Sequence, residues 1–313
     1  MNSAPSPLIL AADIGGTHVE LGLVDERGRV LQRATHKTAG FVAPESFVEA
    51  LCAARTRFEA KAEGPIRAIG IGAPNGHHAR GTIEFAPNLN WPGQVPLAAM
   101  VQAATGLPVA LDNDANAAAL GEARFGTCVG LDDFVVVTLG TGIGAGLVSG
   151  GQLVRGATGL AGEFGHVTAV PGGRLCACGR KGCIEAYVSG RALGVTYAEL
   201  ARDQGLPVSL MDARALHAAA LAGDALALAT FERSGELFAG PLADLTMLLA
   251  PARIVFLGGL TQAGDILLEP IKRHYAGNLP THTEPVSMLF SPLSDASLAG
   301  AAALALGTTF ARD

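Results

Sequence analysis

The same short pattern occurs twice in this chain, and that repetition constrains the fold more than any other feature of the sequence. The pattern is an apolar run, a loop rich in glycine and threonine, a second apolar run and a turn containing glycine. One copy covers residues 8–28 and the other covers residues 134–151. Each copy is typical of a β-hairpin whose first turn is the glycine loop. Two copies predict two similar lobes.

The remaining sequence alternates between helix and strand patterns, which predicts an α/β protein with a cleft between its lobes. The expected elements are a helix over 47–62, strands over 66–71 and 109–111, an alanine-rich helix over 115–123, and a buried strand over 254–257. A helix follows that last strand, and Pro270 within it should kink or restart it. The final helix, roughly 297–306, is almost all Ala and Leu and should be buried on most sides. Residues 77–91 should form an irregular segment.

Composition and charge exclude several classes of protein. The chain has 313 residues, enough for two lobes with large cores. Its net charge is -6 and no run of Lys or Arg exceeds two residues, so we expect no nucleic-acid partner. No apolar run is long enough to span a bilayer, no secretion signal opens the chain, and its 5 cysteines are an odd number. We therefore expect a soluble, reduced, cytoplasmic protein with no membrane partner.

A histidine and three cysteines lie close together in the sequence. They are His166, Cys176, Cys178 and Cys183, with glycines around them. Three thiolates and an imidazole make a closed tetrahedral shell, which is typical of structural Zn²⁺ and leaves no position for a catalytic water. The alternative is that the cysteines are unliganded core residues or a disulfide pair. Because Cys-x-Cys spacing strains a direct disulfide and a histidine is within ligating reach, we favour the metal site.

The two glycine loops suit the phosphate tail of a nucleotide. They offer backbone N–H groups unobstructed by Cβ atoms, and Asp13 can hold Mg²⁺ through water. One such loop alone is as often a plain structural turn, but a second equivalent copy favours a nucleotide site. A further glycine pair after a strand would let adenine or ribose approach the backbone. The candidate nucleotide-binding residues are Asp13, Gly15, Gly16, Thr17, Gly140, Thr141, Gly142, Gly144, Gly258 and Gly259.

The polar run from Asp112 to Asn116 follows a strand and begins a helix, so one of its acids can cap that helix. For Asp112 and Asn116, a capping role is as well supported as a functional one. Asp114 has the chemistry of a general base, since phosphoryl transfer to an alcohol needs a carboxylate within reach of the attacking hydroxyl.

Further amide and carboxylate side chains are suited to binding sugar hydroxyls, because each can make two hydrogen bonds at once. Candidates of this kind are Asn88, Asn113, Glu163 and Glu185. A metal bound to one ring nitrogen of His166 would leave the other nitrogen to contact a hydroxyl. The alternative for Glu163 is a solvated acid.

These motifs together resemble the ROK family of bacterial sugar kinases and repressors, within the superfamily of actin, hexokinase and heat-shock chaperone ATPases. The resemblance covers nearly the whole chain and keeps the family's order and similar spacing. The matching segments are residues 13–17, 86–89, 111–116, 139–144, 162–166 and 176–185. One departure occurs at Gly72–Gly76, where many members have Pro-Gly without the intervening Asn75. The loop there should be longer or differently turned.

The resemblance implies a two-lobed actin-like ATPase fold, which is ribonuclease H-like, with duplicated lobes and an interlobe cleft. The small lobe would span 1–114 and be joined by the C-terminal helix, about 297–313, while 115–296 would form the larger lobe with the zinc loop. By the same resemblance Asp114 is the catalytic base and the zinc ligands are the four residues named above. The implied sugar contacts are Asn88, Asn113, Glu163, His166 and Glu185.

The implied activity is transfer of the γ-phosphate of ATP, with Mg²⁺, to the 6-hydroxyl of glucose. The alternatives are an N-acetylmannosamine or N-acetylglucosamine kinase of the same family, and a sugar-sensing protein without catalysis. The family's repressors carry a DNA-binding domain before the first glycine loop, and only about a dozen residues precede Asp13, too few for three helices. We therefore expect a kinase, and a homodimer because dimers are common among such proteins.

Overall fold

The chain forms two compact units. The structure, a computed structural model, describes residues 7–86, 89 and 91–307. The first unit comprises Met1–Asp132, Gly146–Ala161 and Ser291–Asp313, and the second comprises Asp133–Ala145 and Gly162–Phe290. Within the described ranges, no helix has both the length and the apolar character needed to cross a membrane. The lobe limits expected from the sequence, at 114 and about 297, remain a prediction.

The first unit is built on a five-stranded sheet, and three of its strands are parallel, so they end at the same edge of the sheet. Its order is β3 (Val30–Lys37), β2 (His18–Val24), β1 (Leu8–Ile14), β4 (Ile66–Ala73) and β8 (Val109–Asn113). The hairpin β1–β2 is antiparallel, whereas β1, β4 and β8 run parallel. Asp13 pairs with Gly72, and Gly72 pairs with Asp112, so the ends of these strands lie side by side at one edge.

Helices cover both faces of this sheet. They are α1 (Pro44–Glu59), α2 (Leu97–Thr105), α3 (Asp114–Phe125) and α9 (Ala296–Ala305), with a short 3-10 turn η1 at Thr38–Gly40. As predicted, α9 is buried, because seven successive residues from Leu298 to Leu304 are shielded from solvent. Small residues permit this packing: a Cβ on Gly70 would lie 1.7 Å from the carbonyl oxygen of Ala301.

Residues 77–91 were expected to be irregular, and in the described part of this segment the expectation is wrong for His77 and Thr82–Glu84, which lie in short strands. Strands β5 (Gly76–His77), β6 (Thr82–Glu84) and β7 (Gln94–Val95) form a small antiparallel sheet. Strands this short carry too few residues to show an alternating pattern. The turn before β5 is fixed by Asn75, which adopts a left-handed φ of 52° and donates from Nδ2 to the Glu84 carbonyl at 2.9 Å.

The second sheet repeats the plan of the first. Its order is β11 (Gln152–Leu153), β10 (Ile143–Ser149), β9 (Phe134–Leu139), β12 (Arg253–Leu257) and β13 (Ser287–Phe290), and the boundary between the units passes through β10. Strands β9, β12 and β13 are parallel. Both predicted copies of the strand–loop–strand pattern are therefore confirmed as equivalent parts of two sheets.

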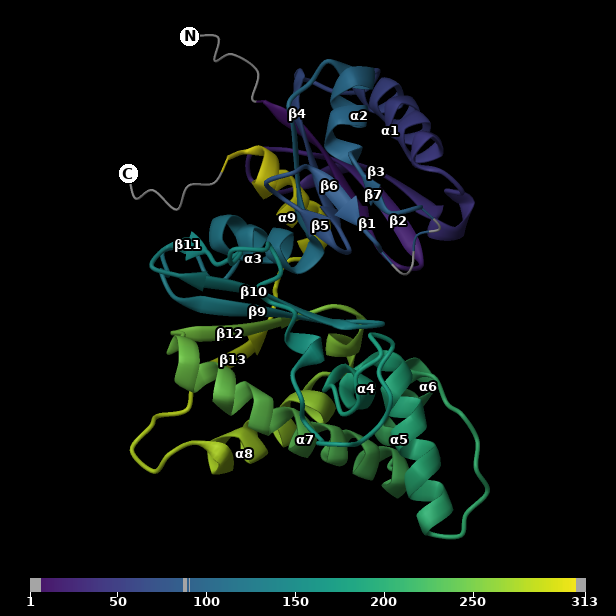
Figure 1. The fold of residues 1–313 in the computed structure, drawn as a ribbon, viewed down its shortest axis with the longest axis vertical. Coiled ribbons are helices and arrows are strands. Elements are labelled where there is room, and N and C mark those ends of the chain that lie inside the picture. The colour runs from purple at the N-terminus through teal and green to yellow at the C-terminus, as the bar shows by residue number, and fades with distance from the viewer. Residues whose placement is uncertain (1–6, 87–88, 90, 308–313) are drawn as a thin grey trace. The chain divides into compact units, whose positions relative to one another are not determined.

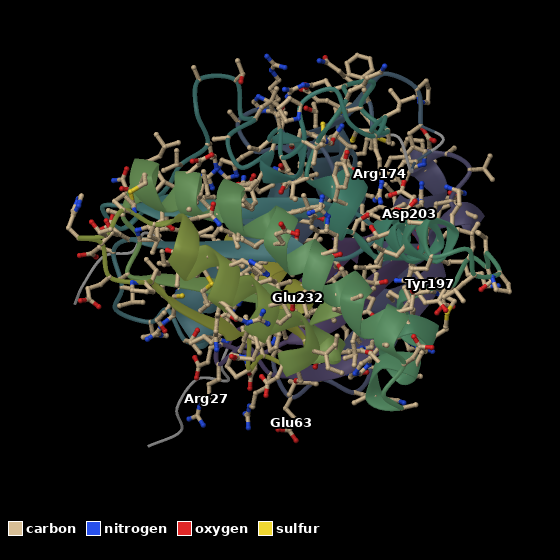
Figure 2. All side chains as sticks on the ribbon, turned by 90° about the horizontal axis from the view of Figure 1, so that it is seen from below. Arg27, Glu63, Arg174, Tyr197, Asp203 and Glu232 are labelled. Atoms are coloured by element: carbon tan, nitrogen blue, oxygen red, sulfur yellow. The ribbon has the colours of Figure 1, made fainter. Side chains whose placement is uncertain are left out.

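The helices of the second unit lie mainly after β11 in the chain. They are α4 (Glu185–Val188), α5 (Gly190–Asp203), α6 (Ala213–Leu221), α7 (Ala225–Leu249) and α8 (Asp265–Asn278), with 3-10 turns η2 (Phe164–His166) and η3 (Gly259–Ala263). Figure 1 shows α7 and α8 running side by side. Glu232 of α7, labelled in Figure 2, accepts hydrogen bonds from Arg273 at 2.7 Å and His274 at 2.6 Å on α8.

Pro270 does not restart the helix that contains it, so that part of the prediction is wrong. Helix α8 runs without interruption from Asp265 to Asn278. Pro270 is buried against α7 at Gly235, where a Cβ would lie only 2.6 Å from the Pro270 Cβ. Close packing between the two helices therefore offsets the hydrogen bond that proline cannot donate.

Candidate functional site

The first glycine loop joins β1 to β2 and leaves two adjacent N–H groups without a partner. The Gly15 N–H closes the hairpin by donating to the His18 carbonyl at 2.9 Å. In the described part of the chain, the N–H groups of Gly16 and Thr17 make no hydrogen bond, and both residues are exposed. Consecutive free N–H groups form a concave site for an anion.

The buried residue Thr38 holds this loop through two of its carbonyl groups. Its hydroxyl donates to the Gly15 carbonyl at 2.7 Å, and its N–H donates to the Thr17 carbonyl at 3.0 Å. Both bonds use the carbonyl side of the loop, so the N–H side stays free. Sequence reasoning missed Thr38, which lies more than 20 residues further along the chain as the first residue of η1, directly after β3.

Asp13 is the last residue but one of β1, beside this loop, and the pKa of its carboxyl group is close to neutral pH. Burial, the largest cause, and the nearby Asp114 carboxylate together raise the pKa of Asp13 to about 7, although a hydrogen bond from Ser297 acts in the opposite direction. A divalent cation would relieve both unfavourable effects, because it stabilises the ionised carboxylate. The donor set therefore fits the hard, oxygen-seeking Mg²⁺ expected there.

Asn113 and Asp114 form the corner between β8 and α3. The helix cap is the amide Asn113, whose Oδ1 accepts from the Ala115 N–H at 2.9 Å, and not an acid as anticipated. The Asp114 carboxylate also accepts from Ala115 N–H at 2.9 Å. Burial raises the pKa of Asp114. A carboxylate with a raised pKa is a better proton acceptor near neutral pH.

Asp112 anchors this corner and does not cap the helix. Its buried carboxylate accepts from Arg155 Nε at 2.8 Å, from Asn113 N–H at 2.8 Å and from Asn116 Nδ2 at 2.9 Å. His78 Nδ1 lies 3.6 Å from the same carboxylate. Arg155 is distant in sequence, and no local pattern indicates this pairing.

The second glycine loop joins β9 to β10 in the same manner as the first. The Gly140 N–H donates to the Gly142 carbonyl at 3.0 Å, and the Gly144 N–H donates to Thr138 Oγ1 at 3.0 Å. The Ile143 N–H donates to Glu185 Oε2 at 2.9 Å. Among the described residues, only Thr141 and Gly142 keep N–H groups without a partner in this loop, so they are its strongest candidates for contacting phosphate.

The glycine pair after β12 has different constraints at its two positions. Gly258 has a φ of 108°, and a Cβ there would lie 2.4 Å from the Leu139 carbonyl. Its own carbonyl accepts from Thr261 Oγ1 at 2.7 Å. A Cβ on Gly259 would meet no atom within 4 Å, so the backbone beside it is open to a ligand.

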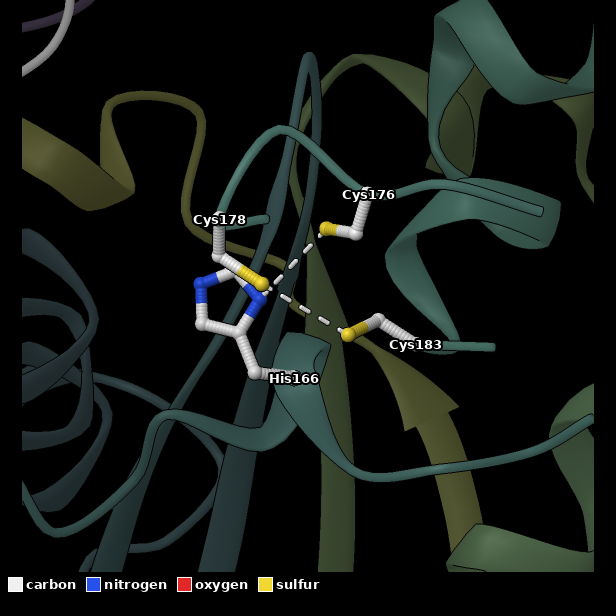
Figure 3. Close-up of side chains that lie close together, drawn as sticks. All are labelled: His166, Cys176, Cys178 and Cys183. Carbon is white, nitrogen blue, oxygen red and sulfur yellow. Dashed lines mark hydrogen bonds between the residues drawn. The ribbon is translucent and has the colours of Figure 1, made fainter. Parts of the chain in front are cut away.

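The four predicted metal ligands are brought together, as Figure 3 shows. One ligand atom from each residue lies within 4.8 Å of all the others. His166 Nδ1 is 3.8 Å from Cys176 Sγ, and Cys178 Sγ is 3.7 Å from Cys183 Sγ. Tetrahedral Zn²⁺ with bonds of about 2.3 Å separates its sulfur ligands by about 3.8 Å. The cluster therefore fits a metal ion of this size.

The predicted sugar contacts fall in both units. His166 turns Nδ1 toward the sulfur atoms and Nε2 toward Glu163, whose Oε2 lies 3.7 Å away. Glu163 and His166 have side chains 43% and 31% exposed, so both polar groups are accessible to a ligand. Glu185 also belongs to the second unit, Asn113 belongs to the first, and Asn88 lies outside the described residues.

Comparison with known proteins identifies the family. The model of the ROK family matches residues 9–308. This chain belongs to the ROK family. A glucokinase of Streptomyces coelicolor is 40% identical to this ROK protein over 282 residues, covering 86% of the chain and 87% of the relative. An N-acetylmannosamine kinase of Citrobacter koseri is 33% identical over 305 residues, covering 95% and 98%.

Solved structures agree on the fold. A ROK family glucokinase from Streptomyces griseus, in complex with glucose and AMPPNP, matches with a TM-score of 0.83 and 37% identity, over 96% of this chain and 100% of that one. A ROK family transcriptional regulator matches with a TM-score of 0.84 and 26% identity, over 96% of this chain and 77% of its own. The ROK protein therefore has the two-lobed, actin-like ATPase fold that the resemblance implied.

The segment of this ROK protein that carries the His–Cys cluster is also held in place by Arg174. Its N–H donates to Tyr187 Oη at 2.7 Å, and its guanidinium stacks 4.5 Å over the Tyr187 ring. The same guanidinium donates to Glu199 Oε1 at 3.1 Å and to the Ala186 carbonyl at 2.9 Å. Arg174 thus ties the segment to α4 and α5 without using the metal ligands.

Because of this second attachment, metal removal should loosen the segment without unfolding the protein. We expect the purified chain to carry a single zinc ion, and we expect chelation to lower the melting temperature by less than about 5 °C. Amide exchange should accelerate within residues 166–183. Elemental analysis, calorimetry and hydrogen exchange measure these effects. Global unfolding on chelation would contradict the anchoring role of Arg174.

Proposed function

We propose that this protein is an ATP-dependent kinase that transfers the γ-phosphoryl group of ATP to the 6-hydroxyl of glucose. The observation that carries this proposal is the set of groups that meet where β1, β4 and β8 end, at one edge of the first sheet. There the free N–H groups of the first glycine loop, the acid Asp13 and the carboxylate of Asp114 follow neighbouring strand ends. Phosphate binding, cation binding and proton transfer are the three tasks that phosphoryl transfer needs.

In the proposed reaction Asp114 orients the sugar hydroxyl and accepts its proton. The bond between O6 and the γ-phosphorus forms while the bond from that phosphorus to the β,γ-bridging oxygen breaks, and ADP leaves. Mg²⁺, when bound, would neutralise charge on the phosphate oxygens. Asp13 would hold the cation through water, and Gly16, Thr17, Thr141 and Gly142 would donate N–H groups to phosphate. The proposed sugar contacts are Asn88, Asn113, Glu163, His166 and Glu185.

The Cys₃His cluster is proposed to hold structural Zn²⁺. A metal on Nδ1 of His166 fixes the ring, so that Nε2 carries the proton and can donate to a sugar hydroxyl. We further propose a cytoplasmic homodimer, since ATP is the phosphoryl donor and such kinases are commonly dimeric. Light scattering on the purified chain measures the oligomeric state.

Glucose is favoured over acetamido sugars because the similarity to a glucokinase, 40% identity, exceeds the 33% shared with the N-acetylmannosamine kinase. The alternative substrates are N-acetylmannosamine and N-acetylglucosamine. The other class is a sugar sensor without catalysis, and the presence of Asp114 with both glycine loops argues against it.

A panel of sugars assayed for ADP release, with ATP and Mg²⁺, tests the proposal. We expect the highest kcat/KM with glucose and a value at least about 10-fold lower for N-acetylmannosamine and N-acetylglucosamine, because a pocket shaped for a hydroxyl excludes a bulkier group. The reverse order would make the protein an acetamido-sugar kinase. Tight sugar binding with no ADP release would establish the sensor.

A further inference from the structure

Glu185 makes a contact that its proposed role as a sugar ligand does not explain. It is the first residue of α4, and its Oε2 accepts a hydrogen bond from the Ile143 N–H at 2.9 Å. The carboxylate rests against the loop itself, because a Cβ on Gly142 would lie 2.6 Å from Oε2. One carboxylate oxygen is thus committed to the second glycine loop.

The carbonyl side of Ile143 is held as well. A Cβ on Gly165 would lie 2.3 Å from the Ile143 carbonyl oxygen, so the backbone before His166 packs directly on it. Two residues further along, the Ala145 N–H donates to the Gly162 carbonyl at 2.8 Å. Ile143 is therefore enclosed by two segments, one leading to His166 and the other following Cys183.

The contact decides which N–H groups of the loop remain free. With Ile143 bound to Glu185 and Gly144 bound to Thr138, only the N–H groups of Thr141 and Gly142 stay unpaired in the described part of this loop. Ile143 is 6% exposed, so without Glu185 its N–H would lack both water and a carboxylate. An unpaired buried N–H is unfavourable, and the loop would rearrange to satisfy it.

We propose that Glu185 is a positioning residue for nucleotide binding: its carboxylate holds Ile143 so that Thr141 and Gly142 face the phosphates. This inference rests on the proposed kinase function and adds a role for Glu185 beyond contact with the sugar. The other carboxylate oxygen, Oε1, lies 3.9 Å from Cys176 Sγ, so the same side chain also contacts the His–Cys cluster. Glu185 therefore links the sugar-binding segment to the nucleotide-binding loop.

Nucleotide affinity measured without sugar separates this role from a sugar contact alone. Titration calorimetry with AMPPNP and Mg²⁺ would compare the wild type with Glu185→Ala, Glu185→Gln and Glu163→Gln. We expect Glu185→Ala to weaken AMPPNP binding about 10-fold. Glu185→Gln should stay within about 3-fold of the wild type, since its amide oxygen can still accept from Ile143.

Glu163→Gln is the matched control, because Glu163 is the other carboxylate proposed to contact the sugar. It should weaken glucose binding and leave sugar-free AMPPNP affinity unchanged. Unchanged AMPPNP affinity in a folded Glu185→Ala variant would overturn the proposal.

Hydrogen exchange on the wild-type protein gives a second test that needs no variant. The Ile143 amide should exchange at least about 10-fold more slowly than those of Thr141 and Gly142. Equal rates at the three amides would overturn the positioning role. If the wild type bound no AMPPNP, the kinase proposal would fail, and the exchange rates would still report whether Glu185 holds the loop.

Discussion

Asp114→Asn should lower kcat about 1000-fold while the protein stays folded. The amide keeps the size of the side chain and can still accept from the Ala115 N–H, which now bonds the carboxylate at 2.9 Å. It cannot take a proton from the attacking hydroxyl. Steady-state ADP release measures kcat, and calorimetry measures folding. Burial raises the pKa of Asp114, so the ionised carboxylate is unfavourable in the folded protein. Because a neutral amide avoids this cost, the variant should be at least as stable as the wild type.

Asp203→Asn is the matched control, because it makes the same change in charge at an exposed residue, labelled in Figure 2 at the end of α5. Its kcat should equal that of the wild type. The pH profile gives an independent check: wild-type kcat should fall as acid protonates Asp114, at a pH above the usual range of an aspartate. A kcat within about 10-fold of wild type for Asp114→Asn would exclude its role as the base.

Asp13→Asn should lower the activity of the protein and raise its stability. Loss of the carboxylate should lower kcat/KM for Mg-ATP by roughly 100-fold, the effect typical of removing an outer ligand of a bound metal. In metal-free buffer the same variant should be more stable than the wild type at pH 8. The wild-type carboxyl has a pKa of about 7 in the folded protein against an ordinary value of 3.8, so its ionisation opposes folding.

The sign of this effect with pH follows from the raised pKa. Protonated Asp13 contributes stability that is fully present below about pH 4 and is lost as the pH rises through 7. The stability gained by Asp13→Asn should therefore grow by about 3 kcal/mol between pH 5 and pH 8. Urea unfolding at the two values, with EDTA present, measures it. A gain independent of pH would show that Asp13 ionises normally.

The features that the sequence predicted correctly are encoded locally. Both hairpins, the buried final helix and the cluster of His166 with its three cysteines depend on residues within one short stretch or one repeating pattern. Apolar alternation, glycine at tight turns and paired ligand spacing each act over fewer than about 20 residues, so a single sequence displays them.

The features that the sequence did not reveal depend on distant partners. Thr38 supports the first loop, Arg155 neutralises Asp112, and Glu185 binds Ile143, and each pair is joined only by the folded chain. Arg155 and Thr38 belong to residue types that are common on protein surfaces, so nothing local distinguishes them. The predicted restart at Pro270 was wrong for a related reason, because the packing of this proline depends on Gly235 in another helix.

The burial of α9 against the first sheet also affects how the chain can fold during its synthesis. Leu298, Ala301 and Ala302 share one apolar cluster with Ile9, Ala11 and Val24. Because α9 follows β1 and β2 by more than 270 residues, the face of these strands that α9 covers stays exposed until Ala296–Ala305 has been synthesised. A fragment that ends before Ala296 would leave the apolar face of Ile9, Ala11 and Val24 exposed to water, so we expect it to be less stable than the full chain.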